Sequence, residues 1–168
     1  MMLKTSKVRG FTLVELMITI ALLAIILSLA VPNMGFFVKK RALRSTFDEL
    51  RLSLAYARSE AVKQGKNIYV LPATGGWALG WCVTESSSSC DPSNDQLLRT
   101  FTPHSKTITF SDGLNPNTCD AFPSNGIIFT KKGTTSNTLK LMIQDSSIDT
   151  QLFIEVSRTG RTSSTPCS

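Results

Sequence analysis

Hydrophobic residues are concentrated near the start of the chain. Residues 11–31 read FTLVELMITIALLAIILSLAV, and Glu15 is the only charged residue among these 21. A helix of this length extends about 30 Å, which is the thickness of the hydrocarbon core of a bilayer. The pattern therefore predicts a membrane-spanning helix over residues 11–31. A secretory signal peptide is the alternative, but its apolar segment usually holds only about 7 to 15 residues.

The hydrophobic pattern changes after Pro32. Proline has no N–H and clashes with the preceding helical turn, so a kink is predicted at this residue. Beyond it, apolar residues follow steps of three, four and seven, which places them on one stripe of a helix. They are Phe36, Leu43, Phe47, Leu50, Leu54, Ala57 and Ala61. Residues 32–65 are therefore predicted to continue the helix as far as a stop at Gly65, with the stripe packed on another part of the chain.

The remaining residues, 66–168, have the pattern of short strands. Runs of β-branched, aromatic and aliphatic residues alternate with turn residues such as glycine, serine, asparagine and aspartate. The predicted strands are 68–71, 77–84, 97–101, 107–110, 127–130, 138–143 and 152–156. The serine-rich stretch 85–95 is interpreted as a hairpin loop. The predicted fold class is α+β, with a long N-terminal helix packed on an antiparallel β-sheet or sandwich.

Composition and charge agree with one folded domain. The chain has 168 residues, of which 42% are hydrophobic and 18% are charged, and this excludes a disordered chain and a long soluble coiled coil. The formal charge of +6 belongs to the N-terminal third, because residues 66–168 hold eight basic and eight acidic residues. Net charge is therefore no argument that the C-terminal part binds nucleic acid. Three arginines, Arg44, Arg51 and Arg58, repeat every seven residues, and we favour a solvated helix face over a binding stripe as their interpretation.

All four cysteines, Cys82, Cys90, Cys119 and Cys167, follow the apolar segment. They lack the paired Cys-x-x-Cys spacing of a zinc site, so we interpret them as disulfides and predict no metal site. Four cysteines allow three connectivities. We favour Cys82 with Cys90, which closes the serine-rich loop, and Cys119 with Cys167, which fastens the C-terminus. Disulfides imply an oxidising compartment such as the periplasm or the cell surface.

Candidates for catalysis are few. His104 is the only histidine and is interpreted as a surface loop residue, and the sequence contains no HExxH, no GxSxG and no phosphate-binding glycine loop. We predict no catalytic residue, no cofactor and no enzymatic activity. Glu15 is a candidate of another kind, because a carboxylate within a membrane segment is costly and needs a cationic partner. The alternative is that Glu15 lies at the lipid headgroups and has no role.

Basic residues near the C-terminus form a second candidate site. Arg158 and Arg161 flank Gly160 in the run SRTGRTSS. Guanidinium groups and backbone N–H groups in such a turn could bind phosphates. Lys131 and Lys132 are further candidates for binding DNA. On the residues alone, a solvated strand end is the favoured interpretation.

The N-terminal residues resemble a known processing signal. Arg9-Gly10-Phe11-Thr12-Leu13-Val14-Glu15-Leu16, between a short basic leader and the apolar run, resembles the class III signal of type IV prepilins and type II secretion pseudopilins. The resemblance implies that a prepilin peptidase cuts after Gly10 and methylates the new N-terminus, Phe11. It also implies that Glu15 pairs with the terminal amine of a neighbouring subunit during filament assembly. Cleavage creates an α-amino group with a pKa of about 7.7 to 8.0, which could compensate the buried carboxylate.

The residues LAYARSEAV at 54–62, the strand-rich part and the late Gly160-Arg161 resemble the GspH/FimT/FimU family of minor pilins and minor pseudopilins. The family implies a pilin-like fold in four segments: a leader at 1–10, a transmembrane or filament-core helix at 11–31, its amphipathic continuation at 32–65, and a periplasmic, disulfide-bonded β domain at 66–168. The implied location is the inner membrane and then a filament at the cell surface. The implied partners are other minor and major pilins and the prepilin peptidase.

Three functions follow from this resemblance. The first is a minor pilin of a type IV pilus that helps to prime assembly at or near the tip. The second is a competence pilin that binds DNA, for which the family uses a late Gly-Arg-x-Arg motif. This chain has Gly160-Arg161-Thr162-Ser163, so the second arginine is missing, whereas Arg158 lies upstream. The third is the H-type minor pseudopilin of a type II secretion system.

Overall fold

The computed structural model describes residues 10–30, 34–87, 90–91, 95–111 and 119–164. The chain divides into two compact units, Met1–Phe37 and Val38–Ser168, and each is described here by itself. The predicted kink at Pro32, most of the predicted leader and Cys167 lie outside the described residues.

The first unit contains helix α1, Leu13–Ala30, which has 18 residues. It is shorter than the 21-residue apolar run, because Thr12 caps its N-terminus: the Thr12 hydroxyl accepts the N–H of Glu15 at 3.2 Å. The large apolar side chains from Phe11 to Leu27 are exposed. Among the described residues, no helix is both long enough and apolar enough to cross a membrane.

Helix α2, Met34–Gln64, runs along the second unit and stops where the sequence predicts. Gly65 follows it with φ 66°, the left-handed conformation that glycine adopts without strain at the end of a helix. Six residues of the predicted stripe are buried: Leu43, Phe47, Leu50, Leu54, Ala57 and Ala61. Phe36, the first residue of that stripe, is 45% exposed and belongs to the first unit. The prediction that it packs in the core is therefore wrong.

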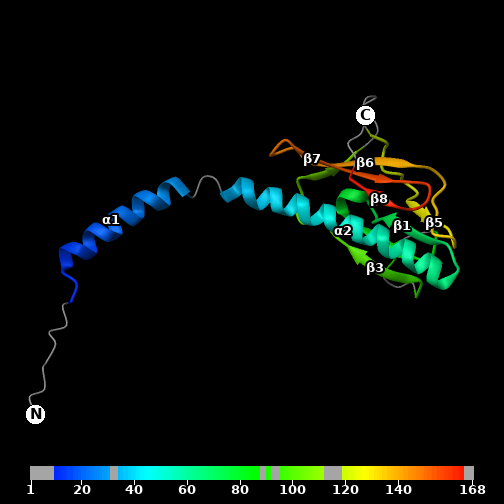
Figure 1. Ribbon diagram of the computed structural model, residues 1–168, viewed down its shortest axis with the longest axis horizontal. Coiled ribbons are helices and arrows are strands. Elements are labelled where there is room, and N and C mark those ends of the chain that lie inside the picture. The colour runs from blue at the N-terminus through cyan, green and yellow to red at the C-terminus, as the bar shows by residue number, and fades with distance from the viewer. Residues whose placement is uncertain (1–9, 31–33, 88–89, 92–94, 112–118, 165–168) are drawn as a thin grey trace, which may run out of the picture. The chain divides into compact units, whose positions relative to one another are not determined.

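The strands form two four-stranded antiparallel sheets (Figure 1). Sheet A has the order β3-β2-β1-β5, and sheet B has the order β4-β6-β7-β8. The strands are β1 Ile68–Pro72, β2 Trp81–Thr84, β3 Leu97–Phe101, β4 Ile108–Phe110, β5 Ile127–Phe129, β6 Leu139–Asp145, β7 Thr150–Val156 and β8 Thr162–Ser163. This arrangement confirms the predicted α+β fold class.

The predicted strand 77–84 is wrong in its first half. Residues Trp77–Leu79 form a 3-10 turn, and β2 begins only after Gly80. Gly80 has φ 132°, and a Cβ placed there would lie 2.5 Å from the carbonyl oxygen of Phe101. The backbone can approach β3 this closely only at a glycine. Trp77 turns inward instead and donates its indole N–H to the Pro123 carbonyl at 3.1 Å.

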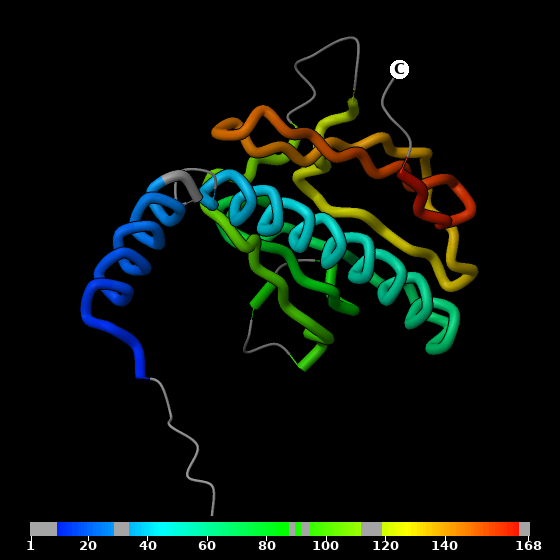
Figure 2. The backbone as a smooth tube through the Cα atoms, turned by 60° about the vertical axis from the view of Figure 1, so that its left-hand side comes forward, coloured from blue at the N-terminus to red at the C-terminus, as the bar shows by residue number. Residues whose placement is uncertain are grey.

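The core lies between α2 and the two sheets. Both backbone views show α2 running between sheet B and the β3 side of sheet A (Figures 1 and 2). Trp81 of β2 is fully buried, stacks on Phe101 with ring centroids 5.7 Å apart, and donates its indole N–H to the buried Ser53 hydroxyl of α2 at 2.9 Å. The predicted packing of the α2 stripe on the strand-rich part is confirmed.

One buried charge makes the stability of this unit depend on pH. Burial alone would raise the pKa of Asp145, but hydrogen bonds donated by Ser147 and Thr107 and the positive charge of Lys39 outweigh it and lower the pKa. The resulting stabilisation is present above the ordinary aspartate pKa of about 3.9 and is lost as the pH falls through the lowered value.

We expect Asp145→Asn to lower the free energy of unfolding by about 2 kcal/mol at pH 7, the contribution of hydrogen bonds to a charged group. Urea denaturation at pH 7 and pH 3 checks this, and a difference from the parent that does not shrink at pH 3 would contradict it.

Candidate functional site

The predicted processing residues lie together at the start of α1. Gly10, Phe11, Thr12 and Glu15 line one open hollow of about 550 Å³. Phe11 is 84% exposed, so the Gly10–Phe11 peptide bond lies on an accessible stretch before the helix. The Thr12 cap fixes the backbone of Glu15, while the Glu15 carboxylate makes no hydrogen bond or ion pair within the described residues. A cation could therefore reach this carboxylate from the same hollow.

The cysteines are placed as the disulfide interpretation requires. Cys82 of β2 is bonded to Cys90, which confirms the first predicted pair. The bridge closes the serine-rich connection between the antiparallel strands β2 and β3. Cys119 is also disulfide-bonded, and its predicted partner, Cys167, lies outside the described residues. The pairing of these two residues stays a prediction.

The predicted basic residues lie on two tight turns that pack against each other. Lys131 and Lys132 belong to the turn that the Gly133 N–H closes on the Thr130 carbonyl at 2.7 Å. Arg158 belongs to a second turn, closed by the Gly160 N–H on the Ser157 carbonyl at 2.8 Å. The two turns touch closely, because a Cβ at Gly160 would lie 2.1 Å from the Gly133 carbonyl oxygen. The structure thus brings together residues that are almost thirty positions apart in the chain.

Arg58 of α2 joins the two turns, a role that was not predicted from the sequence. Its Nε donates to the Gly133 carbonyl at 3.1 Å, and the same atom would lie 3.0 Å from a Cβ at Gly160. Arg58 is exposed, as the interpretation of a solvated face expects, but its side chain also spans from the helix to both turns. The only signal in the sequence was the arginine spacing of seven, which fits a solvated face equally well.

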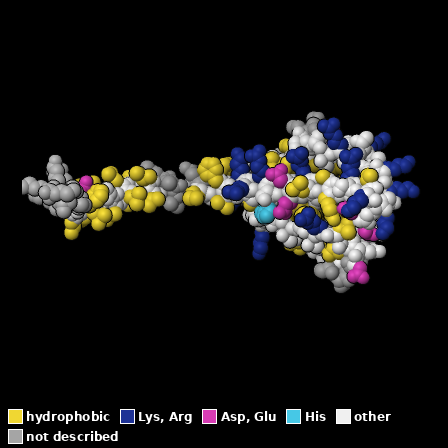
Figure 3. All heavy atoms as spheres, turned by 60° about the horizontal axis from the view of Figure 1, so that its bottom comes forward, with side chains coloured by type: hydrophobic (Ala, Val, Ile, Leu, Met, Phe, Trp, Pro, Cys, Tyr) yellow, Lys and Arg dark blue, Asp and Glu magenta, His cyan; other side chains and the backbone are white. Residues whose placement is uncertain are grey.

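Five basic side chains at this end of the second unit have no acidic partner within the described residues: Arg58, Lys131, Lys132, Arg158 and Arg161. Lys and Arg side chains gather at the end of the body where α2 stops, on the right in Figure 3. We call these five residues the basic end. Cations without acidic partners on two adjoining turns are suited to bind phosphates.

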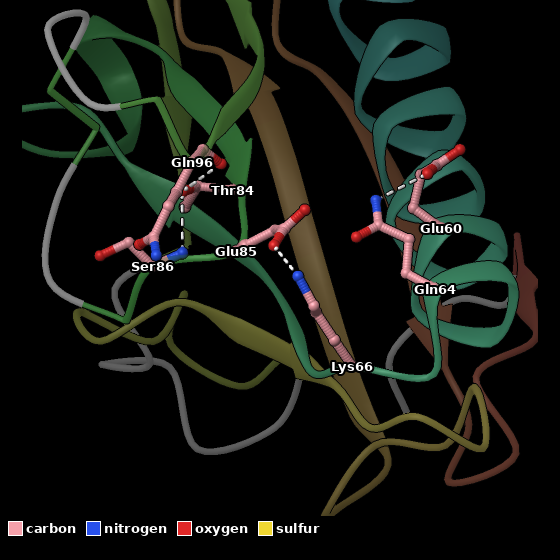
Figure 4. A network of polar contacts seen from close by, with 7 residues as sticks. All are labelled: Glu60, Gln64, Lys66, Thr84, Glu85, Ser86 and Gln96. Atoms are coloured by element: carbon pink, nitrogen blue, oxygen red, sulfur yellow. Dashed lines mark hydrogen bonds and ion pairs between the residues drawn. The ribbon is translucent and has the colours of Figure 1, made fainter.

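The neighbouring lysines are neutralised by carboxylates. Lys66 pairs with Glu85 at 2.8 Å, which joins the start of β1 to the residue after β2 (Figure 4). Lys63 lies 3.3 Å from Glu60 on α2. A hydrogen bond from the Gln64 amide at 2.9 Å, aided by Lys63 and opposed by partial burial, lowers the pKa of Glu60. These lysines therefore add less positive charge to the basic end than their number suggests.

His104 is a half-exposed residue that ties a loop to α2. Its Nε2 lies 3.0 Å from the Glu49 carboxylate, and its backbone N–H donates to the Thr46 hydroxyl at 2.9 Å. These contacts give the loop between β3 and β4 a fixed place on the helix. His104 therefore has a structural role in holding this loop on α2.

Two family models match the chain. The model described as type II transport protein GspH matches residues 46–160, and the prokaryotic N-terminal methylation motif matches residues 5–31. No curated protein matches the chain at a significant level.

Solved structures share the fold. The type IV minor pilin FimU of Pseudomonas aeruginosa is 24% identical, with a TM-score of 0.58 over 77% of this chain and 92% of that one. A second crystal form of FimU gives 23% identity and a TM-score of 0.55 over 73% of this chain and 92% of that one. The minor pseudopilin EpsH of Vibrio cholerae is 12% identical, with a TM-score of 0.50 over 77% of this chain and 96% of that one.

An apolar N-terminal helix with a methylation motif, followed by a helix packed on two antiparallel sheets, defines a pilin-like protein. Such proteins are the subunits of type IV pili or of the pseudopili of type II secretion systems. The GspH model covers more than half of the chain, and the chain therefore belongs to the GspH family of minor pilins and pseudopilins. The matched families are structural proteins rather than enzymes.

Proposed function

We propose that this chain is a minor pilin of a type IV pilus that helps to prime assembly at or near the filament tip. Residues 1–10 are the leader, and a prepilin peptidase removes it after Gly10 and methylates Phe11. Residues 11–31 then hold the subunit in the inner membrane, with the disulfide-bonded part in the periplasm, until it joins other minor and major pilins. The type II secretion pseudopilin is the alternative within the same family and shares these steps.

The exposure of apolar side chains on α1 is the observation that carries this proposal. The helix exposes large hydrophobic residues from Leu13 to Leu27. A helix that is apolar on all sides is stable only in lipid or among other apolar helices. The single carboxylate, Glu15, sits in its first turn without a partner in the described residues. A lipid anchor that later becomes part of a filament core accounts for both features.

Processing is tested by the mass of the mature chain. When the chain is made together with a prepilin peptidase, we expect it to begin at N-methylated Phe11, because the scissile bond lies on the accessible stretch before α1. Mass spectrometry of the intact protein and of its N-terminal peptide measures this. A Gly10→Val chain is the control and should keep its leader. An uncut leader on the parent chain would contradict the proposal.

DNA binding is a second candidate function, and the geometry of the basic end favours it. The turn of Lys131 and Lys132 packs directly on the turn of Arg158, with Arg58 between them. Arg161 follows the second turn and is exposed, as Arg158 is. Five cations without acidic partners then face solvent from one end of the body, which is the arrangement that a phosphate backbone requires.

Replacing Lys131, Lys132, Arg158 and Arg161 by glutamine is expected to weaken DNA binding and to flatten its salt dependence. Each lost phosphate contact reduces the slope of log K against log salt by about 0.9. The matched control removes four charges elsewhere on the body, by Lys40→Gln, Arg41→Gln, Lys106→Gln and Lys140→Gln. Fluorescence anisotropy with a labelled duplex over a salt series measures both quantities. Unchanged affinity and slope in the first variant, or equal losses in both variants, would exclude the basic end as a DNA site.

A further inference from the structure

A pocket between α2 and β7 belongs to neither candidate site. It has a volume of about 320 Å³, and Arg44, Phe47, Asp48 and Arg51 of the helix line it together with Leu152 and Phe153 of the strand. The helical residues are spaced by three, four and seven, so they share one face of α2. The pocket therefore combines an apolar floor with three charged groups.

Arg51 is the unusual residue of this pocket. Its Nε is buried and has no hydrogen-bond partner within the described residues. The guanidinium carbon lies 5.8 Å from the centroid of the Phe47 ring, so the aromatic ring supports the planar group. Buried N–H donors in native proteins are nearly always paired, and an unpaired one indicates a missing partner.

The charges of the pocket define that partner. The side chains of Arg44, Asp48 and Arg51 make no hydrogen bond or ion pair in the part of the chain that the structure describes, so the pocket carries one net positive charge. One carboxylate from outside would neutralise it, whereas a phosphate dianion would overcompensate it. The forked donors of arginine match the two oxygens of a carboxylate.

Among the described residues, no strand pairs with the edge of β7 beside the pocket. Strand β8 pairs only with Glu155 and Val156, so no described strand covers the first five residues of β7 on that side. Ser157 donates its N–H across this edge to the Arg161 carbonyl at 2.9 Å. Alternate residues of an antiparallel strand direct their backbone groups to the same side, so Phe153 and Gln151 direct theirs to the open edge. An added strand would satisfy these groups.

We propose that this pocket is a docking site for an extended segment of another polypeptide that carries one aspartate or glutamate. The backbone of the segment pairs with the open edge of β7, its apolar neighbours cover Leu152 and Phe153, and its carboxylate binds the Arg51 guanidinium. A free anion would leave the strand edge and the apolar floor uncovered. That the segment belongs to a neighbouring filament subunit rests on the proposed function, but the docking site itself does not.

The test uses the full-length chain in detergent micelles, labelled with ¹⁵N-arginine. The probe is the peptide acetyl-Thr-Val-Glu-Val-Thr-amide, and its matched control has glutamine in place of glutamate. We expect the glutamate peptide to shift the Arg51 Nε–H resonance and to bind at least tenfold more tightly than the glutamine peptide. Arg51→Lys should remove the resonance and weaken binding of the glutamate peptide at least tenfold, whereas Arg41→Lys, an exposed arginine outside the pocket, should leave binding unchanged.

Several results would overturn the proposal. Equal binding of the two peptides, or binding of neither, would show that the pocket does not select a carboxylate segment. An equal shift with acetate alone at the same concentration would make it a site for free anions. A change in the Arg51 resonance of the unliganded protein after removal of residues 165–168 would show that the chain's own C-terminus occupies it. All of these results are independent of whether the chain is processed at Gly10.

Discussion

A chain in which Glu15 is replaced by glutamine is expected to enter filaments at least tenfold less often than the parent chain. The carboxylate lies in the same hollow as Phe11, and the proposed cleavage after Gly10 would free the α-amino group of Phe11, which would be largely protonated at neutral pH. In a filament core, the amine of one subunit and the carboxylate of the next would form a buried ion pair. Removing one partner of such a pair costs about 3–5 kcal/mol, and each 1.4 kcal/mol is a factor of ten.

The measurement is the amount of the variant in sheared filaments, relative to its amount in the membrane. The matched control is Glu155→Gln, which removes one carboxylate from β7 and should leave incorporation unchanged. Mass spectrometry must show that the Glu15 variant is still cut after Gly10, so that a processing defect is not mistaken for an assembly defect. Normal incorporation of a correctly processed Glu15→Gln chain would remove the physical basis of the docking role.

The fold could be predicted largely from local patterns. The stripe of α2 identified six of its buried residues, and β3 has the predicted bounds, because helix and strand periodicities depend on near neighbours. The wrong predictions result from contacts between residues that are far apart in the sequence. Trp77 favours a strand, but residues 77–79 form a turn, because Gly80 must pass close to Phe101 of another strand. Strand β8 is two residues long and has too little sequence for any pattern.

The two candidate sites also differ in how far they could be predicted from nearby residues in the sequence. Gly10, Phe11 and Glu15 could be identified as candidates because they lie within six residues of one another at the start of one helix. The basic end could be predicted only in part, because the four residues named from the sequence are joined by Arg58, which is more than seventy positions away from Gly133. The docking pocket between α2 and β7 had no signal in the sequence, since Arg44 and Arg51 have the spacing of a solvated face.

Gly160→Ala is expected to destabilise the second unit by about 2–5 kcal/mol, the combined cost of a left-handed backbone and an overpacked contact. Gly160 has φ 72°, and a Cβ there would meet the Gly133 carbonyl oxygen at 2.1 Å and the Arg58 side chain at 3.0 Å. Neither neighbour can yield cheaply, because the first is backbone and the second is hydrogen-bonded to that same carbonyl. The substitution should therefore separate the two basic turns as well as strain the chain.

Gly65→Ala is the matched control for this substitution. Gly65 has φ 66°, almost the same backbone conformation, but no atom lies within 4 Å of the added Cβ. Gly65→Ala should lower the free energy of unfolding only by the cost of a left-handed backbone, about 1–2 kcal/mol. Urea denaturation of both variants with the disulfides intact gives the two free energies of unfolding, and their difference isolates the close approach of the turns. If Gly65→Ala and Gly160→Ala lower the free energy of unfolding by the same amount, the turns are not held in contact. The basic end is then a set of independent surface charges rather than one site.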